Sequence, residues 1–147
     1  MADPQVAFHF NADDKLAYGA RLVRKGYLRG ARMLVWGDPR QLEQLSHILW
    51  TQTPGDFVGH ACPTDPAAVQ THSKVRLVAQ LPEQAPEATM LVNLTDAFPG
   101  DAIDGYERVF EIVTAAPEDR QGGRQRWMAY RQAGIEPDRH DLGGSSA

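Results

Sequence analysis

The sequence has little cysteine, no long apolar run and no secretion signal, and each absence excludes a class of protein. A lone cysteine, Cys62, rules out an internal disulfide framework in these 147 residues. No apolar stretch approaches the roughly 20 residues that a membrane-spanning helix needs. The opening MADPQVAFHF lacks the basic start and apolar stretch of a signal peptide. Together these features favour a cytoplasmic protein without a membrane partner.

Motifs for nucleotide binding and catalysis are also missing. The first expected strand-to-helix turn reads HFNADDK, without glycine, and neither GxGxxG, GxxxxGK[ST] nor GxSxG occurs. Asp13 and Asp14 in that turn would repel a phosphate, and helix capping is a better interpretation for them than a Mg²⁺ site. The histidines lack metal-ligand spacing, and an inert loop thiol is a better interpretation of Cys62 than a nucleophile paired with histidine. The sequence therefore predicts no cofactor, no metal and no catalytic site.

The apolar runs that are present are typical of one α/β domain. Five runs are expected to form strands: QVAFHF, ARMLVWG, VRLVAQL, ATMLVNLT and YERVFEIVT. Helical patterns follow Asp13-Asp14, follow Asp38-Pro39, and extend over about 118–133. This alternation predicts a single domain over residues 1–147, with a largely parallel central sheet flanked by helices and a frayed tail from about residue 138. The fold would be Rossmann-like without the nucleotide-binding glycine loop.

Charge is segregated along the chain, although the net charge is only −4. Residues 83–119 carry nine acids and a single base, whereas residues 15–32 and 120–131 carry bases and no acid. The net charge argues against a general nucleic-acid binder, while the segregation predicts local fields of opposite sign. Solvated helix faces are the simpler interpretation of each cluster. The bases of the two acid-free segments are Lys15, Arg21, Arg24, Lys25, Arg29, Arg32, Arg120, Arg124, Arg126 and Arg131.

The second expected helix places a tryptophan away from its apolar stripe. Leu42, Leu45 and Leu49 share one side of the helix, and Trp50 projects well off that side. Phe57 follows the turn at Pro54-Gly55, where it either folds back over the sheet or joins Trp50. An exposed Trp-Phe pair would be an anchor for a protein partner.

The last expected helix combines arginines with another tryptophan. Helical spacing groups Trp127 with Arg120, Arg124 and Arg131, and places the small residues Ala129 and Ala133 opposite them, against the sheet. Tyr130 would lie at the edge between the two sides. A guanidinium beside an indole can bind a carboxylate next to an apolar group. That surface suits either a short acidic peptide ending in a hydrophobic residue or a single-stranded nucleic acid.

Two segments together resemble the chi subunit of bacterial DNA polymerase III: LWTQTPGDFVGH at residues 49–60 and RWMAYRQAGI at residues 126–135. The likeness covers nearly the whole chain, including RMLVWG. It implies a mononucleotide-binding fold that has lost its nucleotide site, and a non-catalytic accessory subunit of the clamp-loader assembly. Such subunits connect that assembly, through a psi subunit, to single-stranded DNA-binding protein (SSB), whose acidic C-terminal tail ends in a hydrophobic residue.

The resemblance also implies roles for individual positions. Trp50 and Phe57 match the psi-facing aromatics. Arg124 and Trp127 match the pocket for the SSB tail, with Val113 as a wall. Met128 stands where the family often has a basic residue, so one carboxylate contact is lost, and Arg131 or Arg120 would compensate for it.

Three functions from different classes follow from these patterns. The favoured one is a non-enzymatic adaptor in DNA replication. The second is direct binding of single-stranded nucleic acid through the Arg/Trp side of the last helix. The third is a degenerate nucleotide-dependent enzyme that uses Asp13 and Asp14. Salt dependence, dependence on a peptide terminus, and response to nucleotides with Mg²⁺ would separate them.

Overall fold

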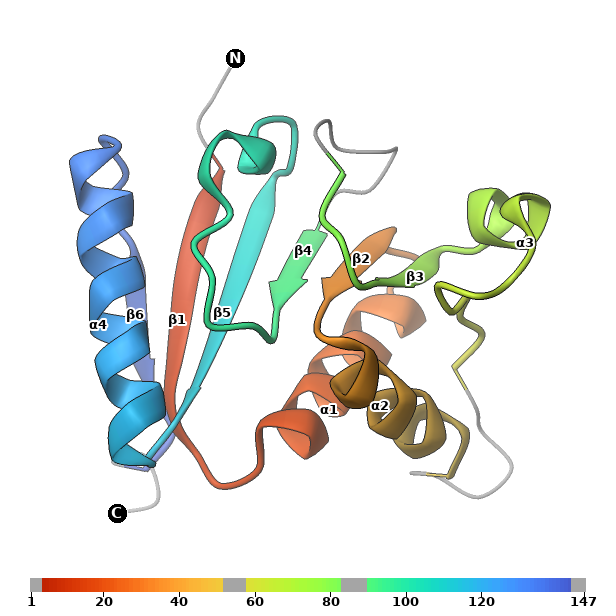
Figure 1. The fold of residues 1–147 in the computed structure, drawn as a ribbon, viewed down its shortest axis with the longest axis horizontal. Coiled ribbons are helices and arrows are strands. Elements are labelled where there is room, and N and C mark those ends of the chain that lie inside the picture. Colours follow the sequence, from red (N-terminus) through yellow and green to blue (C-terminus); the bar gives the residue numbers. More distant parts are fainter. Residues whose placement is uncertain (1–3, 52–57, 83–89, 144–147) are drawn as a thin grey trace.

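The computed structural model describes residues 4–51, 58–82 and 90–143. Its strands are β1 (Gln5–Ala12), β2 (Met33–Trp36), β3 (Val75–Val78), β4 (Met90–Asn93), β5 (Arg108–Thr114) and β6 (Asp138–Asp141). Its α-helices are α1 (Lys15–Leu28), α2 (Pro39–Thr51), α3 (Ala67–His72) and α4 (Pro117–Gln132), and a short 3-10 helix, η1, spans Gly100–Ile103. These elements form one α/β domain, as the alternating pattern predicts (Figure 1).

All six strands join one parallel sheet in the order β3-β2-β4-β5-β1-β6. The prediction of a largely parallel sheet is confirmed, and every described pairing is parallel. β1, the first strand of the chain, lies between β5 and β6, with Val6 opposite Val109 and Phe8 opposite Arg139. Parallel strands require crossover connections, and α1, α2 with α3, and α4 lie in three of them.

Helices cover both faces of the sheet, so the core has two layers. On one face α1 and α2 pack over Val35, Leu77, Val92 and neighbouring side chains of the sheet. On the other face Val6, Phe8 and Val109 are buried with Tyr130 of α4 and Ile103 of η1. Strands buried on both faces explain the continuous apolar runs in the sequence.

Side-chain caps define where α1 and α2 begin. Asp14 Oδ1 accepts hydrogen bonds from the backbone N–H groups of Leu16 and Ala17, both at 3.1 Å, which confirms the predicted capping role. Before α2, Asp38 Oδ1 accepts from the Gln41 backbone N–H at 2.8 Å, and Gln41 Oε1 accepts from the Asp38 N–H at 3.0 Å. This reciprocal pair is a capping box, which holds the start of α2 at the end of β2.

The prediction of a frayed tail from residue 138 is wrong for residues 138–141. They form β6, whose residues pair with Ala7 to Phe10 of β1. The Leu142 N–H then donates to the Phe10 carbonyl at 2.9 Å. The segment DRHD contains no apolar residue. Its backbone pairing with β1 and a few polar or ring contacts hold it in the sheet, and these leave no hydrophobic pattern in the sequence.

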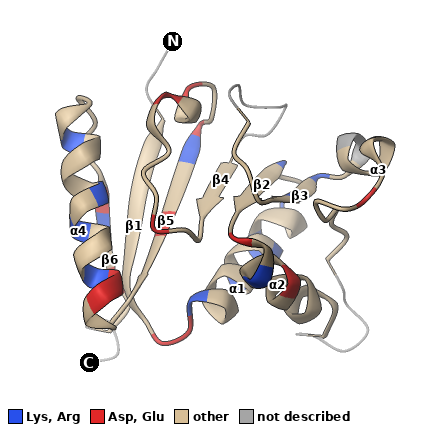
Figure 2. Cartoon of the chain, in the orientation of Figure 1, with Lys and Arg blue, Asp and Glu red and all other residues tan. Residues whose placement is uncertain are grey.

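None of the helices within the described residues is both long enough and apolar enough to cross a membrane. Positive and negative side chains are distributed unevenly over the elements (Figure 2). Lys and Arg occur along α1 and α4, whereas the segment around η1, between β4 and β5, carries acids.

Candidate functional site

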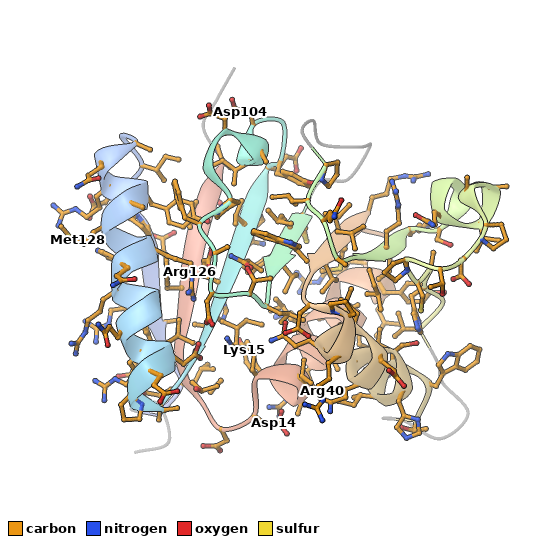
Figure 3. All side chains as sticks on the ribbon, viewed as in Figure 1. Asp14, Lys15, Arg40, Asp104, Arg126 and Met128 are labelled. Atoms are coloured by element: carbon orange, nitrogen blue, oxygen red, sulfur yellow. The ribbon has the colours of Figure 1, made fainter. Side chains whose placement is uncertain are left out.

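The solvent-facing side of α4 carries three arginines and an exposed methionine. Arg120, Arg124, Met128 and Arg131 are all exposed, and Met128 retains 51% of its accessible surface. Spacings of three and four residues place them on neighbouring turns of the same side. Figure 3 shows Met128 pointing away from the sheet, and Arg126 on the opposite, sheet-facing side of α4. We call Arg120, Arg124, Trp127, Met128 and Arg131 the α4 surface.

Trp127 lies at the border of this surface rather than at its centre. Its ring contacts Phe8 edge-on, with centroids 5.1 Å apart, and lies 6.1 Å from the Phe10 ring. The side chain is half-buried. The prediction of a fully displayed tryptophan is therefore corrected: one side of the indole packs on β1, and the remaining side is available beside Arg124.

The sheet-facing side of α4 also differs from the prediction. Gly123, Arg126 and Tyr130 are buried there, whereas Ala129 is half-buried and Ala133 is exposed. The helix is thus rotated relative to the predicted orientation. This rotation points Arg126 into the core. A sequence pattern assigns an arginine to the polar, solvent-facing side of a helix.

A buried ion pair explains how the core accepts that arginine. Arg126 Nε donates to Glu111 Oε1 at 2.8 Å, and the two side chains are 2% and 0% exposed. Glu111 Oε2 accepts from the Tyr130 hydroxyl at 2.7 Å and from Asn93 Nδ2 at 3.0 Å. Burial raises the pKa of Glu111, and Arg126, Tyr130 and Asn93 oppose that shift.

The sequence pattern does not predict this network, because glutamate and arginine side chains are ordinarily expected at the surface. The only signal is an acid inside the strand run VFEIV and an arginine directly before Trp127. Complementary charges on adjacent elements were the feature to look for, since a buried charge requires a partner.

Val113, expected as a wall of the tail pocket, is fully buried. It lies beneath α4, where a Cβ added at Gly123 would come within 2.8 Å of Val113 Cγ2. Val113 therefore supports the helix from below and offers no surface to a ligand in this conformation.

The three arginines of the α4 surface differ in whether a carboxylate already pairs with them. Arg131 Nε is 3.5 Å from Glu136 Oε2, in a pair with both side chains largely exposed. Within the described residues, Arg120 and Arg124 form no ion pair. The Arg139 guanidinium of β6 lies 5.3 Å above the Phe10 ring. The Phe10 ring is in turn the neighbour of Trp127. The surface therefore combines unpaired guanidiniums with an apolar floor made by Trp127 and Phe10.

Trp50 at the end of α2 is 58% exposed, as its place off the apolar stripe predicts. Its ring contacts His60 with centroids 6.1 Å apart. Phe57, the second aromatic of the expected pair, lies outside the described residues. Leu42, Leu45 and Leu49 are buried, which confirms the predicted core stripe of the helix.

Among the side chains that the structure describes, Cys62 does not pair directly with a histidine. His60 Nδ1 donates to the Val58 carbonyl at 2.7 Å, so its Nε2 accepts from the Ser46 hydroxyl at 2.7 Å. The Cys62 thiol is 3.5 Å from that same hydroxyl oxygen. The serine separates the two groups, and no group of three potential metal ligands occurs in the part of the chain that the structure describes.

The chain as a whole is similar to known proteins. Residues 4–138 match the family model described as DNA polymerase III chi subunit, HolC. The chain is also similar to the protein named DNA polymerase III subunit chi from Pseudomonas aeruginosa. The two are 28% identical over 129 residues, which make up 87% of each chain.

Proposed function

The chain belongs to the DNA polymerase III chi subunit family, and from that premise we propose that it is a non-catalytic adaptor of the polymerase III holoenzyme. In this role it connects the clamp loader, through a psi-like subunit, to the C-terminal tail of SSB in the cytoplasm. The observation that carries the proposal is the α4 surface, where exposed Arg124 adjoins half-buried Trp127.

The α4 surface fits an acidic peptide with a hydrophobic C-terminal residue. Arg124 has no competing carboxylate among the described residues, so it is available to a terminal carboxylate. The terminal side chain would contact Trp127, whose position is set by Phe8 and Phe10. Arg120, one turn earlier, would attract the preceding acids of the tail.

Two positions of this surface have altered roles relative to the expectation. Met128 offers an exposed thioether side chain instead of a base, and it would extend the apolar contact beside Trp127. Arg131 already faces Glu136, so Arg120 is the better candidate to compensate for the missing charge. Val113 would act indirectly, by fixing the height of α4 above the sheet.

Calorimetric titration with an SSB tail peptide tests this role. Arg124→Ala should weaken binding by about 1.5–3 kcal/mol, because it removes a charge-assisted hydrogen bond. Arg40→Ala, which removes an exposed arginine on α2, is the matched control and should bind normally. A peptide that lacks its last residue should bind much more weakly than the intact tail. Equal binding of the two peptides would contradict recognition of the terminal residue, and the α4 surface would then be only a non-specific basic surface.

The second surface is centred on Trp50, and we assign it, with Phe57, to the psi-like subunit. A tryptophan with more than half of its surface exposed at a helix end is the kind of side chain that dominates interfaces. Trp50→Ala should leave the unfolding transition nearly unchanged, yet cost about 2 kcal/mol or more in partner binding. Co-purification of the tagged variant with its partner subunit measures this loss. Unchanged recovery of the partner would refute the assignment.

A further inference from the structure

A cleft of about 890 Å³ lies on the same sheet face as α1, along the side of that helix. Its walls are α1, the strands β1 and β5, and the segment after β6. It is separate from the α4 surface, because α4 packs on the opposite face of the sheet. Neither the family comparison nor the proposed adaptor role uses it.

Positive side chains surround this cleft. Arg21 and Lys25 line it from successive turns of α1, Arg29 lines it from the cap at the end of that helix, and Arg108 lines it from β5. All four are exposed, and none has an ion-pair partner within the described ranges. Among the described residues that line the cleft, Asp13 is the single acid, at the end where α1 begins. Three of these bases, Arg21, Lys25 and Arg29, belong to the acid-free segment 15–32, and Figure 2 shows basic residues on α1.

Flat rings form the floor between these charges. The His9 and His140 rings stack with centroids 4.8 Å apart, and His9 meets Phe110 edge-on at 5.8 Å. Arg21 lies 5.8 Å above the Tyr18 ring, and Arg108 lies 5.0 Å above the Phe110 ring. The cleft thus places guanidiniums and aromatic surfaces next to each other.

His9 adds a polar group without a partner. Its Nδ1 is hydrogen-bonded to the Tyr18 hydroxyl, whereas its Nε2 is buried and has no hydrogen-bond partner in the structure. Burial, together with the charges of His140, Arg108 and Lys25, lowers the pKa of His9 to about 4. Several positive groups therefore converge on this ring, as they would around the place of an anion.

We propose that the α1 cleft binds a short segment of single-stranded nucleic acid. Its phosphates would lie along Arg21, Lys25, Arg29 and Arg108, and its bases would stack on the histidine and tyrosine rings. A positively charged groove with interleaved rings is the arrangement by which proteins bind single strands without reading their sequence. An acidic peptide would use the charges but would leave the rings without stacking partners.

Fluorescence anisotropy with a labelled oligothymidylate at low salt tests the proposal on the full-length chain. Arg29→Ala and Lys25→Ala should each weaken binding by about tenfold, as loss of a charge-assisted contact predicts. Each should also reduce the slope of log affinity against log salt by about 0.7, the value for one phosphate on a single strand. His140→Ala should weaken binding without changing that slope. Arg40→Ala is the matched control and should bind like the unmodified chain.

Three outcomes would overturn the proposal: no binding at low salt, equal loss in Arg29→Ala and Arg40→Ala, or displacement of the oligonucleotide by an equimolar polyglutamate peptide. Arg124→Ala separates the two surfaces. If it abolishes oligonucleotide binding while Arg29→Ala does not, the α4 surface is the nucleic-acid site and the cleft is not. The same variants are also titrated with the SSB tail peptide. Loss of oligonucleotide binding tests the cleft, whereas loss of tail-peptide binding tests the adaptor role, so the two proposals can fail independently.

Discussion

Gly123 sets the distance between α4 and the sheet. A methyl group at this position would lie 2.8 Å from Val113 Cγ2 and 3.1 Å from Cγ1, closer than carbon atoms pack. Glycine costs stability within a helix, so its presence here reflects the close approach rather than helix formation. We expect Gly123→Ala to lower the free energy of unfolding by about 1–3 kcal/mol, because the core beneath it becomes overpacked.

The neighbouring glycine supplies the control for that experiment. A Cβ at Gly122 would be 3.3 Å from Arg126 Nη1, a looser approach than the 2.8 Å between a Cβ at Gly123 and Val113 Cγ2. Gly122→Ala should therefore keep more of the gain in helix propensity. Urea denaturation of both variants compares them directly. If Gly122→Ala loses as much stability as Gly123→Ala, the contact with Val113 is not what requires glycine at position 123.

The Glu111–Arg126 pair predicts a pH-dependent variant. Removal of Arg126 leaves Glu111 buried without its cation, which costs about 3–5 kcal/mol near neutral pH. It also raises further a pKa that burial already places above its ordinary value of 4.5. A carboxyl with a raised folded-state pKa binds its proton more tightly in the folded chain. Its contribution to stability is therefore fully present below pH 4.5 and is lost as pH rises through the folded value.

We therefore expect the stability deficit of Arg126→Met to be smaller at pH 5 than at pH 8. Urea unfolding at the two pH values measures the deficit relative to the unmodified chain. Arg124→Met removes an exposed arginine from the same helix, and its effect should not change with pH. A deficit of Arg126→Met that is equal at both pH values would mean that Glu111 keeps its ordinary protonation without Arg126.

Among the elements, those with an apolar pattern could be predicted from the sequence and the others could not. The five apolar runs became β1 to β5, and the helices α1, α2 and α4 begin within a residue or two of the predicted starts. Helix α3 and strand β6 carry little apolar periodicity, and both were missed. The predicted orientation of α4 is also wrong, because the sequence places Ala129 and Ala133 against the sheet, whereas Gly123, Arg126 and Tyr130 are the buried residues. Trp50 was placed correctly because three leucines mark the buried side of α2.

Strand β6 should contribute to stability despite its polar sequence. It supplies backbone partners to β1, and Asn11 Nδ2 donates to Asp141 Oδ1 at 2.7 Å. We expect a chain ending at Pro137 to be less stable than one ending at Gly143 by at least about 2 kcal/mol, since several hydrogen bonds are lost. Thermal or urea unfolding compares the two truncations. Equal stability would show that β6 adds nothing to the sheet.

On the scale of the whole molecule, the two proposed protein-binding surfaces lie on separate layers. Trp50 belongs to α2 and the α4 surface to the helix on the other face of the sheet (Figure 1). Residues that are far apart and share no partner usually make additive contributions. We therefore expect Trp50→Ala to leave the affinity for the SSB tail peptide unchanged within about 0.5 kcal/mol. Titration of the tail peptide into the chain, with and without its psi-like partner, measures any coupling between the two surfaces. A change in tail-peptide affinity above that limit would indicate that the surfaces are coupled through the sheet.

The position of β1 between β5 and β6 has a consequence for biosynthesis. β1 leaves the ribosome first, but both of its neighbours come from residues 108–141. β2 can pair with β3 and with β4 before β5 is synthesised. Val6 and Phe8, buried in the finished sheet, are therefore without their strand partners for most of translation. In a nascent chain of this topology, the apolar strand β1 stays unpaired until β5 arrives, and unpaired strands of that kind are prone to aggregate unless a chaperone shields them or synthesis is completed quickly.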